Sequence, residues 1–140
     1  MDSGNRARFA LLERQLDNED FEAFFETIRS IFASLPYTLS AQRDEAWFHT
    51  LFYVMVSASG VNAQSELMTS RGRIDMVMEF ANKVFIIEFK CNLSAQAAIK
   101  QIKKKGYAER YKHLGKEIFL LGIDCNTKEK NLKEWKVEKL

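Results

Sequence analysis

Two apolar runs around a short turn, within residues 73–90, constrain the fold of this chain more than any other segment. The first run follows Asp75, and the second ends at Glu88-Phe89-Lys90, with Ala81-Asn82 between them. Two such runs joined by two turn residues predict a β-hairpin.

The expected register of this hairpin divides its side chains between two faces. One face is almost wholly apolar and pairs Phe80 with Lys83, Met78 with Phe85, Met76 with Ile87 and Ile74 with Phe89. The other face pairs Glu79 with Val84, Val77 with Ile86, Asp75 with Glu88 and Arg73 with Lys90. Opposed Cβ atoms in an antiparallel pair lie roughly 4.5–5.5 Å apart, so the carboxylates of Asp75 and Glu88 would repel each other. A divalent cation would relieve that repulsion, and a lysine beside two carboxylates suits a metal-dependent phosphodiesterase.

Four segments in order extend this pattern: RDEAWFHTLFY (43–53), SELMTSRGRIDMVMEF (65–80), VFIIEFK (84–90) and AIKQIKKKGYAERY (98–111). With Asp75, a 12-residue gap and Glu88-x-Lys90, the chain resembles the PD-(D/E)XK nuclease superfamily. Over about residues 43–124 it resembles the type found as the C-terminal domain of bacterial AAA-ATPase-like proteins. The resemblance implies a restriction-endonuclease-like fold and nuclease activity that depends on Mg²⁺ or Mn²⁺.

The resemblance also implies roles for the central residues. Asp75 and Glu88 would be metal ligands, joined by the main-chain carbonyl of Phe89. Lys90 would orient or help deprotonate the attacking water and stabilise negative charge on the phosphate, or it would simply pair with Glu88. Glu45 matches the acidic residue of the family's N-terminal helix and would complete the metal shell, although a carboxylate is also favoured near any helix N-terminus.

Further candidates surround this set. Gln101 matches the glutamine that several branches of the superfamily place beside the active site. His49 lies one turn after Glu45 and could contact the phosphate or hold Glu45, but a lone histidine on an apolar helix is more often a hydrogen-bonded core residue. The candidate nucleic-acid contacts are Arg73, Lys103, Lys104, Lys105 and Tyr107, with the alternatives of a solvated charged face and a core aromatic.

Glu66 depends on the turn that precedes the hairpin. A two-residue turn at Arg71-Gly72 would put Glu66 on the face of Asp75, within reach of an accessory role. A three-residue turn at 70–72 would set it opposite Met76 on the apolar face, where a carboxylate is costly.

Charge is distributed unevenly along the 140 residues. Residues 1–82 contain 7 Arg, no Lys and 12 acids, whereas residues 83–140 contain 13 Lys, 1 Arg and 7 acids. A basic half beside a carboxylate cluster suits a polyanionic substrate such as DNA. The alternative is a solvated lysine-rich surface.

Periodicity predicts helices at 5–16, 19–34, about 41–58 and 95–112, with Asn18, Ser40 and Ser94 as N-caps. Strands are predicted at 62–69, 73–80, 84–90, 117–123 and 132–139. The strand at 117–123 follows a helix and should pair parallel to the strand at 84–90 through a right-handed crossover. The expected fold is therefore an α/β class, three-layer α/β/α sandwich around a mixed sheet, with extra N-terminal helices.

The chain is expected to divide at about residue 38. Residues 1–38 would form a helical segment, a possible connector to an AAA-type ATPase domain, and residues 39–140 would form the nuclease-like domain. No Gly-rich phosphate loop is present, so the chain has no ATPase motif of its own. No apolar run is long enough for a membrane span, and Cys91 and Cys125 lack metal-ligand spacing and are expected to be reduced, which favours a cytoplasmic domain.

The first hypothesis is thus a Mg²⁺- or Mn²⁺-dependent nuclease that acts on nucleic acid, with DNA as the expected substrate. The alternative is a catalytically silent module that binds nucleic acid or regulates a partner ATPase. Neither a dimer nor a monomer follows from the residues.

Overall fold

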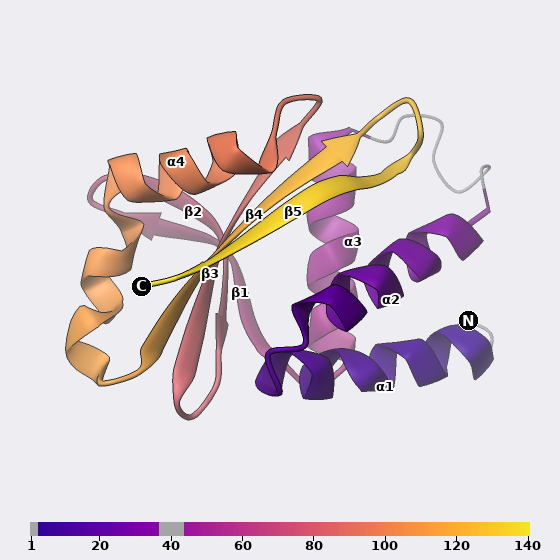
Figure 1. Cartoon of the computed structure of the whole chain (residues 1–140), viewed down its shortest axis with the longest axis horizontal. Helices are drawn as coiled ribbons and strands as arrows, with labels where there is room; N and C mark the ends of the chain where they lie inside the picture. Colours follow the sequence, from indigo (N-terminus) through magenta and orange to yellow (C-terminus); the bar gives the residue numbers. More distant parts are fainter. Residues whose placement is uncertain (1–2, 37–43) are drawn as a thin grey trace.

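A mixed sheet of five strands lies between two layers of helices in the computed structural model, which describes residues 3–36 and 44–140 and side chains from Arg8 onward (Figure 1). One layer contains α1 (Ser3–Asp17), α2 (Phe21–Ser34) and α3 (Glu45–Ala58), and the other contains α4 (Ala95–Lys105) and the 3₁₀ helix η2 (Tyr107–Leu114). The strands are β1 (Asn62–Thr69), β2 (Gly72–Glu79), β3 (Lys83–Cys91), β4 (Glu117–Asn126) and β5 (Asn131–Lys139). The predicted α/β/α sandwich is confirmed.

The strands lie in sequence order across the sheet, β1-β2-β3-β4-β5. The first three strands are antiparallel, β4 pairs parallel to β3, and β5 returns antiparallel to β4. The parallel pairing predicted for residues 117–123 is therefore correct. Because α4 and η2 connect two parallel neighbours, they must cross one face of the sheet.

The β2–β3 hairpin has the predicted register over its first part. The N–H of Phe80 donates to the carbonyl of Lys83 at 2.8 Å and closes the turn at 81–82. Pairing then continues through Met78–Phe85 as far as Met76–Ile87. The pairs predicted beyond that point, Asp75–Glu88, Ile74–Phe89 and Arg73–Lys90, do not form in the ladder.

The pairing of β2 with its other neighbour, β1, is interrupted next to the point where the β2–β3 ladder ends. Glu66 has a positive φ of 57°, and neither Glu66 nor Asp75 pairs in the β1–β2 ladder, although the residues on both sides of each do. This irregularity interrupts the alternation of side chains along β2. Ile74 consequently packs with Val77 under α4 and η2, and the prediction that it shares a face with Phe89 is wrong.

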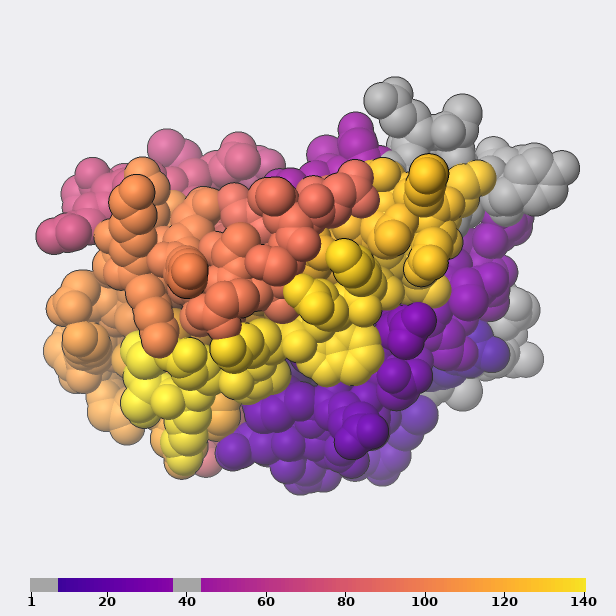
Figure 2. All heavy atoms as spheres, turned by 45° about the horizontal axis from the view of Figure 1, so that its top comes forward, coloured from indigo at the N-terminus to yellow at the C-terminus, as the bar shows by residue number. Residues whose placement is uncertain are grey.

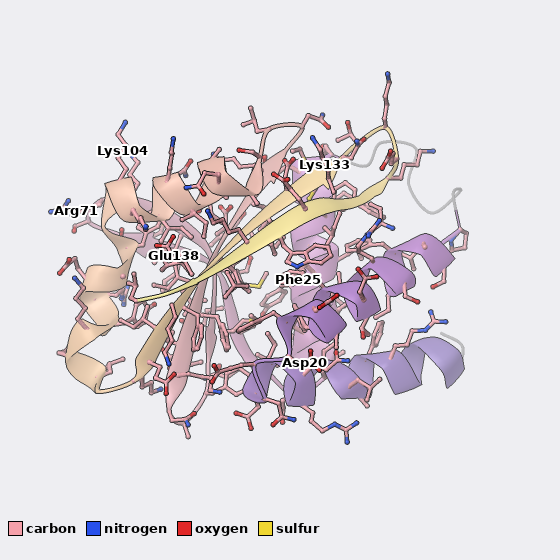
Figure 3. The ribbon with its side chains drawn as sticks, in the orientation of Figure 1. Asp20, Phe25, Arg71, Lys104, Lys133 and Glu138 are labelled. Carbon is pink, nitrogen blue, oxygen red and sulfur yellow. The ribbon has the colours of Figure 1, made fainter. Side chains whose placement is uncertain are left out.

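The larger core lies between the sheet and α1–α3. Helix α2 contributes an apolar stripe with the predicted helical spacing: Phe24, Phe25, Ile28, Ile31 and Phe32. Phe25 points from α2 toward β5 (Figure 3), where its ring stacks on Trp135 with centroids 4.8 Å apart. In the space-filling view, β5 lies at the surface between α4 and the N-terminal helices (Figure 2). Residues of the N-terminal helices therefore share one core with the sheet; their role as a connector stays a prediction.

A buried lysine joins the N-terminal helices to the sheet. The side chain of Lys83, at the start of β3, is 5% exposed. Its Nζ donates to the carbonyl of Asp17 at 2.6 Å and to Glu19 Oε2 at 3.0 Å. Since a buried ammonium without partners is costly, this contact fixes the end of α1 against the hairpin.

The helix predicted over 95–112 is divided in two. Ser94 caps α4 as predicted, accepting from the N–H of Ala97 at 3.0 Å. Gly106 then adopts a left-handed conformation (φ 65°), which ends α4, and η2 begins at Tyr107. A glycine after the lysine run is a common helix C-terminal signal, and it outweighs the helical pattern that continues beyond it.

Two other predicted caps differ from the structure. Helix α2 is capped by Asp20, which accepts from the N–H of Ala23, rather than by Asn18. Helix α3 is capped by Asp44 and begins at Glu45, while the predicted cap Ser40 lies outside the described residues. Among the helices of residues 3–36 and 44–140, none has the length and apolarity needed to cross a membrane.

Candidate active site

Asp75 occupies the point where β2 and β3 separate. Its Oδ2 accepts a hydrogen bond of 2.9 Å from the backbone N–H of Phe89. A side chain thus replaces the strand partner that this N–H would otherwise find across the hairpin. The bond turns the carboxylate toward β3 and holds it, 6% exposed, beside Glu88.

Glu88 is a buried carboxylate with one oxygen satisfied and one not. It is 3% exposed, and its Oε1 accepts from Gln101 Nε2 at 2.6 Å. Its Oε2 is buried and has no hydrogen-bond partner among the described residues. Burial, followed by the charge of Asp75, raises the pKa of Glu88 to about 8. This oxygen therefore favours either a proton or a cation.

Gln101 connects Glu88 to Lys90. Lys90 Nζ donates to Gln101 Oε1 at 2.5 Å, while the amide nitrogen donates to Glu88. Lys90 fixes this orientation of the amide, because an ammonium can only donate and so must face the amide oxygen, which leaves the amide nitrogen to donate to Glu88. Helix α4 thereby supplies one side chain that holds the acid and the lysine in a common arrangement. The predicted proximity of Gln101 to the site is confirmed by these contacts.

Glu45 and His49 reach the site from the first two turns of α3. Both line the same cavity as Asp75, as their spacing of one helical turn predicts. Partial burial at the cleft and then the Asp75 charge raise the pKa of Glu45. His49 stacks on Phe89 with ring centroids 5.0 Å apart, and its Nε2 lies 2.9 Å from Ser65 Oγ. His49 is thus held as a rigid part of the cavity wall.

The full ligand set predicted for the metal is not preformed. Within the described part of the chain, no three acidic, histidine or cysteine side chains already stand at metal-holding spacing. Asp75 and Glu88 interact most strongly, and Glu45, which also lines the cleft, interacts with both. The backbone N–H of Phe89 is engaged by Asp75, and the use of its carbonyl as a ligand stays a prediction.

Two adjacent cavities make up the site. The central cleft, of about 550 Å³, lies over the ends of β2 and β3 and is lined by Glu45, Met68, Gly72, Arg73, Asp75, Glu88, Lys90, Gln101, Lys105 and Tyr107. The α3–β1 cavity, of about 480 Å³, is lined by Glu45, Ala46, His49, Thr50, Tyr53, Ser65, Glu66, Arg73 and Asp75. The two cavities share Glu45, Arg73 and Asp75 and are therefore neighbours, and the predicted carboxylates and lysine all line the central cleft.

The residues predicted to bind nucleic acid do not all lie at the central cleft. Arg73 and Lys105 line the central cleft. Lys103 instead pairs with Glu138 of β5, and Lys104 projects from the outer side of α4 (Figure 3). The three neighbouring lysines diverge because successive residues of a helix point about 100° apart, so a run of like residues does not form one patch.

Tyr107 supports the backbone of β2 beneath the central cleft. It is 4% exposed, and its hydroxyl donates to the carbonyl of Arg73 at 3.0 Å. Its ring packs in the core under α4 and η2, which argues against the predicted contact with nucleic acid. A Cβ at Gly72, where φ is +135°, would lie 3.1 Å from the Tyr107 oxygen, so the turn into β2 requires glycine.

Both registers considered for Glu66 are wrong. The turn residues are Ser70 and Arg71, since Thr69 pairs with Gly72. This register sets Glu66 level with Asp75, and Glu66 lines the α3–β1 cavity. Its carboxylate lies 3.6 Å from the Arg73 guanidinium in an exposed ion pair. Glu66 therefore positions Arg73, and it is not in the central cleft.

Several residues that position α4 were not identified from the sequence. Gly122 of β4 lies beside Glu88, and a Cβ there would be 2.3 Å from the carbonyl oxygen of Ala95. Asp124, fully buried, accepts from the N–H of Leu93, and Glu134 accepts from the N–H of Ala95 at 2.7 Å. A glycine within an apolar strand is a recognised sign of close backbone approach, so the sequence could have indicated the role of Gly122.

Comparison with known proteins agrees with this arrangement. Residues 43–135 match the family model described as the PD-(D/E)XK nuclease superfamily. The chain is also 33% identical over 127 residues to an "Uncharacterized protein in vnfD 5'region" from Azotobacter chroococcum mcd 1. That match covers 86% of this chain and 25% of the other protein, so the chain spans about a quarter of the length of this relative.

Proposed function

This chain belongs to the PD-(D/E)XK nuclease superfamily, and we propose that it is a metal-dependent nuclease that hydrolyses phosphodiester bonds in DNA. The observation that carries the proposal is the convergence of Asp75, Glu88, Gln101 and Lys90 in one open cleft. The superfamily match supports a nuclease-type function. The cleft supports it further, because the residues that the chemistry requires line it together.

The carboxylates suit a hard divalent cation. Glu88 has a buried oxygen that finds no hydrogen-bond partner in the described part of the chain, and Asp75 stands beside it with a second carboxylate. Carboxylate oxygens are the ligands that Mg²⁺ and Mn²⁺ prefer. Asp75 and Glu88 would hold the ion, with Glu45 the third carboxylate at the cleft. When bound, the ion would supply Lewis-acid polarisation of the phosphate and neutralise the paired carboxylates.

The other side chains of the cleft act on water and phosphate. Lys90 Nζ, held by Gln101 Oε1, can donate to the attacking water and to the phosphate oxygen on which negative charge develops. Arg73 lines the cleft at its junction with the second cavity and can bind a phosphate through its guanidinium. Water adds to phosphorus as the ester P–O bond breaks, and the departing oxygen takes a proton, giving a phosphate monoester and a hydroxyl.

The test is a cleavage assay on single-stranded, duplex and branched DNA of one sequence, with Mg²⁺ or Mn²⁺ and with EDTA. We expect cleavage only with the metal, and its loss in Glu88→Gln. Glu117→Gln is the matched control, because Glu117 is an exposed carboxylate paired with Lys139. Metal-independent cleavage, or equal activity in Glu88→Gln, would contradict the proposal. Binding without any cleavage would support the alternative, a silent module that binds nucleic acid or partners an AAA-type ATPase.

A further inference from the structure

The α3–β1 cavity differs in chemistry from the central cleft that it adjoins. Its walls include the rings of His49 and Tyr53 and the small side chains of Ala46 and Thr50. Its volume of about 480 Å³ lies within the range of roughly 300–1,000 Å³ typical of pockets for small ligands. A cavity of this kind is suited to a flat, partly polar group.

The charge around the α3–β1 cavity disfavours a phosphate. Among the described residues, three carboxylates line it, those of Glu45, Glu66 and Asp75, whereas Arg73 is the one Lys or Arg there and is paired with Glu66. The central cleft, by contrast, is also lined by Lys90 and Lys105. A phosphate is therefore favoured in the central cleft and repelled from the neighbouring cavity. Carboxylates at a cavity mouth instead accept hydrogen bonds from N–H groups, such as those on the edges of nucleobases.

The wall of the α3–β1 cavity is rigid. His49 is fixed on one side by its stack on Phe89 and at its edge by Ser65 Oγ. Phe89 is itself fully buried, and its N–H is bound by Asp75. Phe89 thus supports His49 in the cavity wall and also orients the carboxylate of Asp75.

From these observations, and resting on the proposed nuclease function, we propose that the α3–β1 cavity holds an unpaired nucleobase of the nucleotide that adjoins the scissile phosphate. The two cavities share Glu45, Arg73 and Asp75 and so are neighbours, an arrangement that suits a base in one and the phosphate of the same nucleotide in the other. A base inside a duplex is stacked and paired and must be extruded to enter such a pocket, at a cost that is least for a single strand. The substrate class is therefore nucleic acid that is unpaired at the cut: a single strand, or the single-stranded part of a branched molecule.

The variant that tests this is Thr50→Trp, which fills the cavity from the exposed side of α3. Val54→Trp is its control, because Val54 is 49% exposed on the same helix and does not line the cavity. Affinity is measured by fluorescence anisotropy in EDTA, for one labelled oligonucleotide as a single strand and as a duplex. Circular dichroism verifies the fold, and Tyr53→Ala replaces Thr50→Trp if the latter does not fold.

We expect Thr50→Trp to weaken single-strand binding about tenfold, because base stacking contributes roughly 1–3 kcal/mol per base. Duplex binding, and both affinities of Val54→Trp, should be unchanged. Equal single-strand affinity in Thr50→Trp and wild type, or a wild-type preference for the duplex, would overturn the inference.

Parallel cleavage assays separate this inference from the nuclease proposal. If the wild type cuts nothing but Thr50→Trp still loses single-strand affinity, the nuclease proposal fails and the base pocket stands. If the wild type cuts duplex and single strand equally and Thr50→Trp changes neither reaction, the base pocket fails and the nuclease proposal stands.

Discussion

The carboxylate of Asp75 accepts a hydrogen bond from the backbone N–H of Phe89, 2.9 Å away, where the β2–β3 ladder stops. The separation of the two strands leaves this N–H without a backbone carbonyl partner in β2, and the side chain of Asp75 accepts its hydrogen bond instead. The same bond holds one carboxylate against Glu88, whose second oxygen has no partner in the described structure. The fold therefore places the carboxylates of Asp75 and Glu88 close together, where they repel each other when both are ionised.

The metal-free protein should lose stability as the pH rises because of Glu88. Its folded-state pKa of about 8 lies above the ordinary value of 4.5, so the folded protein retains a proton that the unfolded chain releases in this interval. The free energy of unfolding should fall by up to about 1.4 kcal/mol per pH unit between these values. Urea unfolding in EDTA at pH 6 and pH 8 measures this fall, which Glu88→Gln should remove.

Glu117→Gln is the control for that measurement, since Lys139 lowers the pKa of this exposed carboxyl. It should keep the wild-type difference between pH 6 and pH 8. If Glu88→Gln also keeps that difference, the cause lies outside the Asp75–Glu88 pair.

Lys90→Ala should separate catalysis from binding. The ammonium is placed by Gln101 to act on water and on charge developing in the transition state, so its loss should lower the cleavage rate by about 100-fold or more. Affinity for nucleic acid should change only a few-fold, because Arg73 and Lys105 remain in the cleft. Single-turnover kinetics measure the cleavage rate, and fluorescence anisotropy measures the affinity for the same oligonucleotide. An equal fold-loss in rate and in affinity would contradict this role.

Lys105 should contribute more to nucleic-acid binding than Lys103. Lys105 lines the central cleft, whereas Lys103 is paired with Glu138 of β5. Lys105→Ala should reduce the slope of log affinity against log salt concentration by about 0.7–0.9, the value for one phosphate contact. Lys103→Ala is the matched variant and should leave the slope close to that of the wild type. The reverse order would show that the nucleic acid crosses β5 instead.

Gly122→Ala should disturb α4 and, through it, the active site. The added methyl group would lie 2.3 Å from the carbonyl oxygen of Ala95, so the start of α4 must move. We expect a loss of about 1–3 kcal/mol in the free energy of unfolding, the usual cost of overpacking, together with slower cleavage. Gly115→Ala is the comparison, because its added methyl meets no atom within 4 Å; its positive φ should cost stability without affecting the cleft. Unfolding and cleavage are measured on both.

The features that follow from a regular pattern could be predicted from the sequence. Alternation of apolar residues gave the hairpin register from Glu79–Val84 to Met76–Ile87, and a strand after a helix gave the parallel pairing of β3 and β4. The convergence of Asp75, Glu88 and Lys90 in one cleft was also expected. These predictions succeed because they depend on the periodicity of apolar residues, which can be seen within each segment alone.

Features that depend on a single irregular backbone position could not be predicted in this way. Glu66 has a positive φ and the pairing of β1 with β2 is interrupted there, Ile74 lies on the face of Val77, and no residue pattern marks a glutamate for that conformation. Both turns predicted before β2 include Gly72, because glycine is typical of turns, whereas Gly72 begins the strand and leaves room for Tyr107. One wall of the α3–β1 cavity could have been predicted, since His49 and Tyr53 follow Glu45 at intervals of four residues and Thr50 follows Ala46 at the same interval.

Calorimetric titration of Mn²⁺ into the wild type, Asp75→Asn and Glu66→Gln tests most directly whether Asp75 and Glu88 hold a cation. Asparagine can still accept the bond from Phe89, so Asp75→Asn removes charge with little change of geometry. Glu66→Gln removes a carboxylate that lines only the neighbouring cavity. We expect saturable Mn²⁺ binding by the wild type and Glu66→Gln and its loss in Asp75→Asn. Equal Mn²⁺ affinity in the wild type and Asp75→Asn, or no binding by the wild type, would contradict the account.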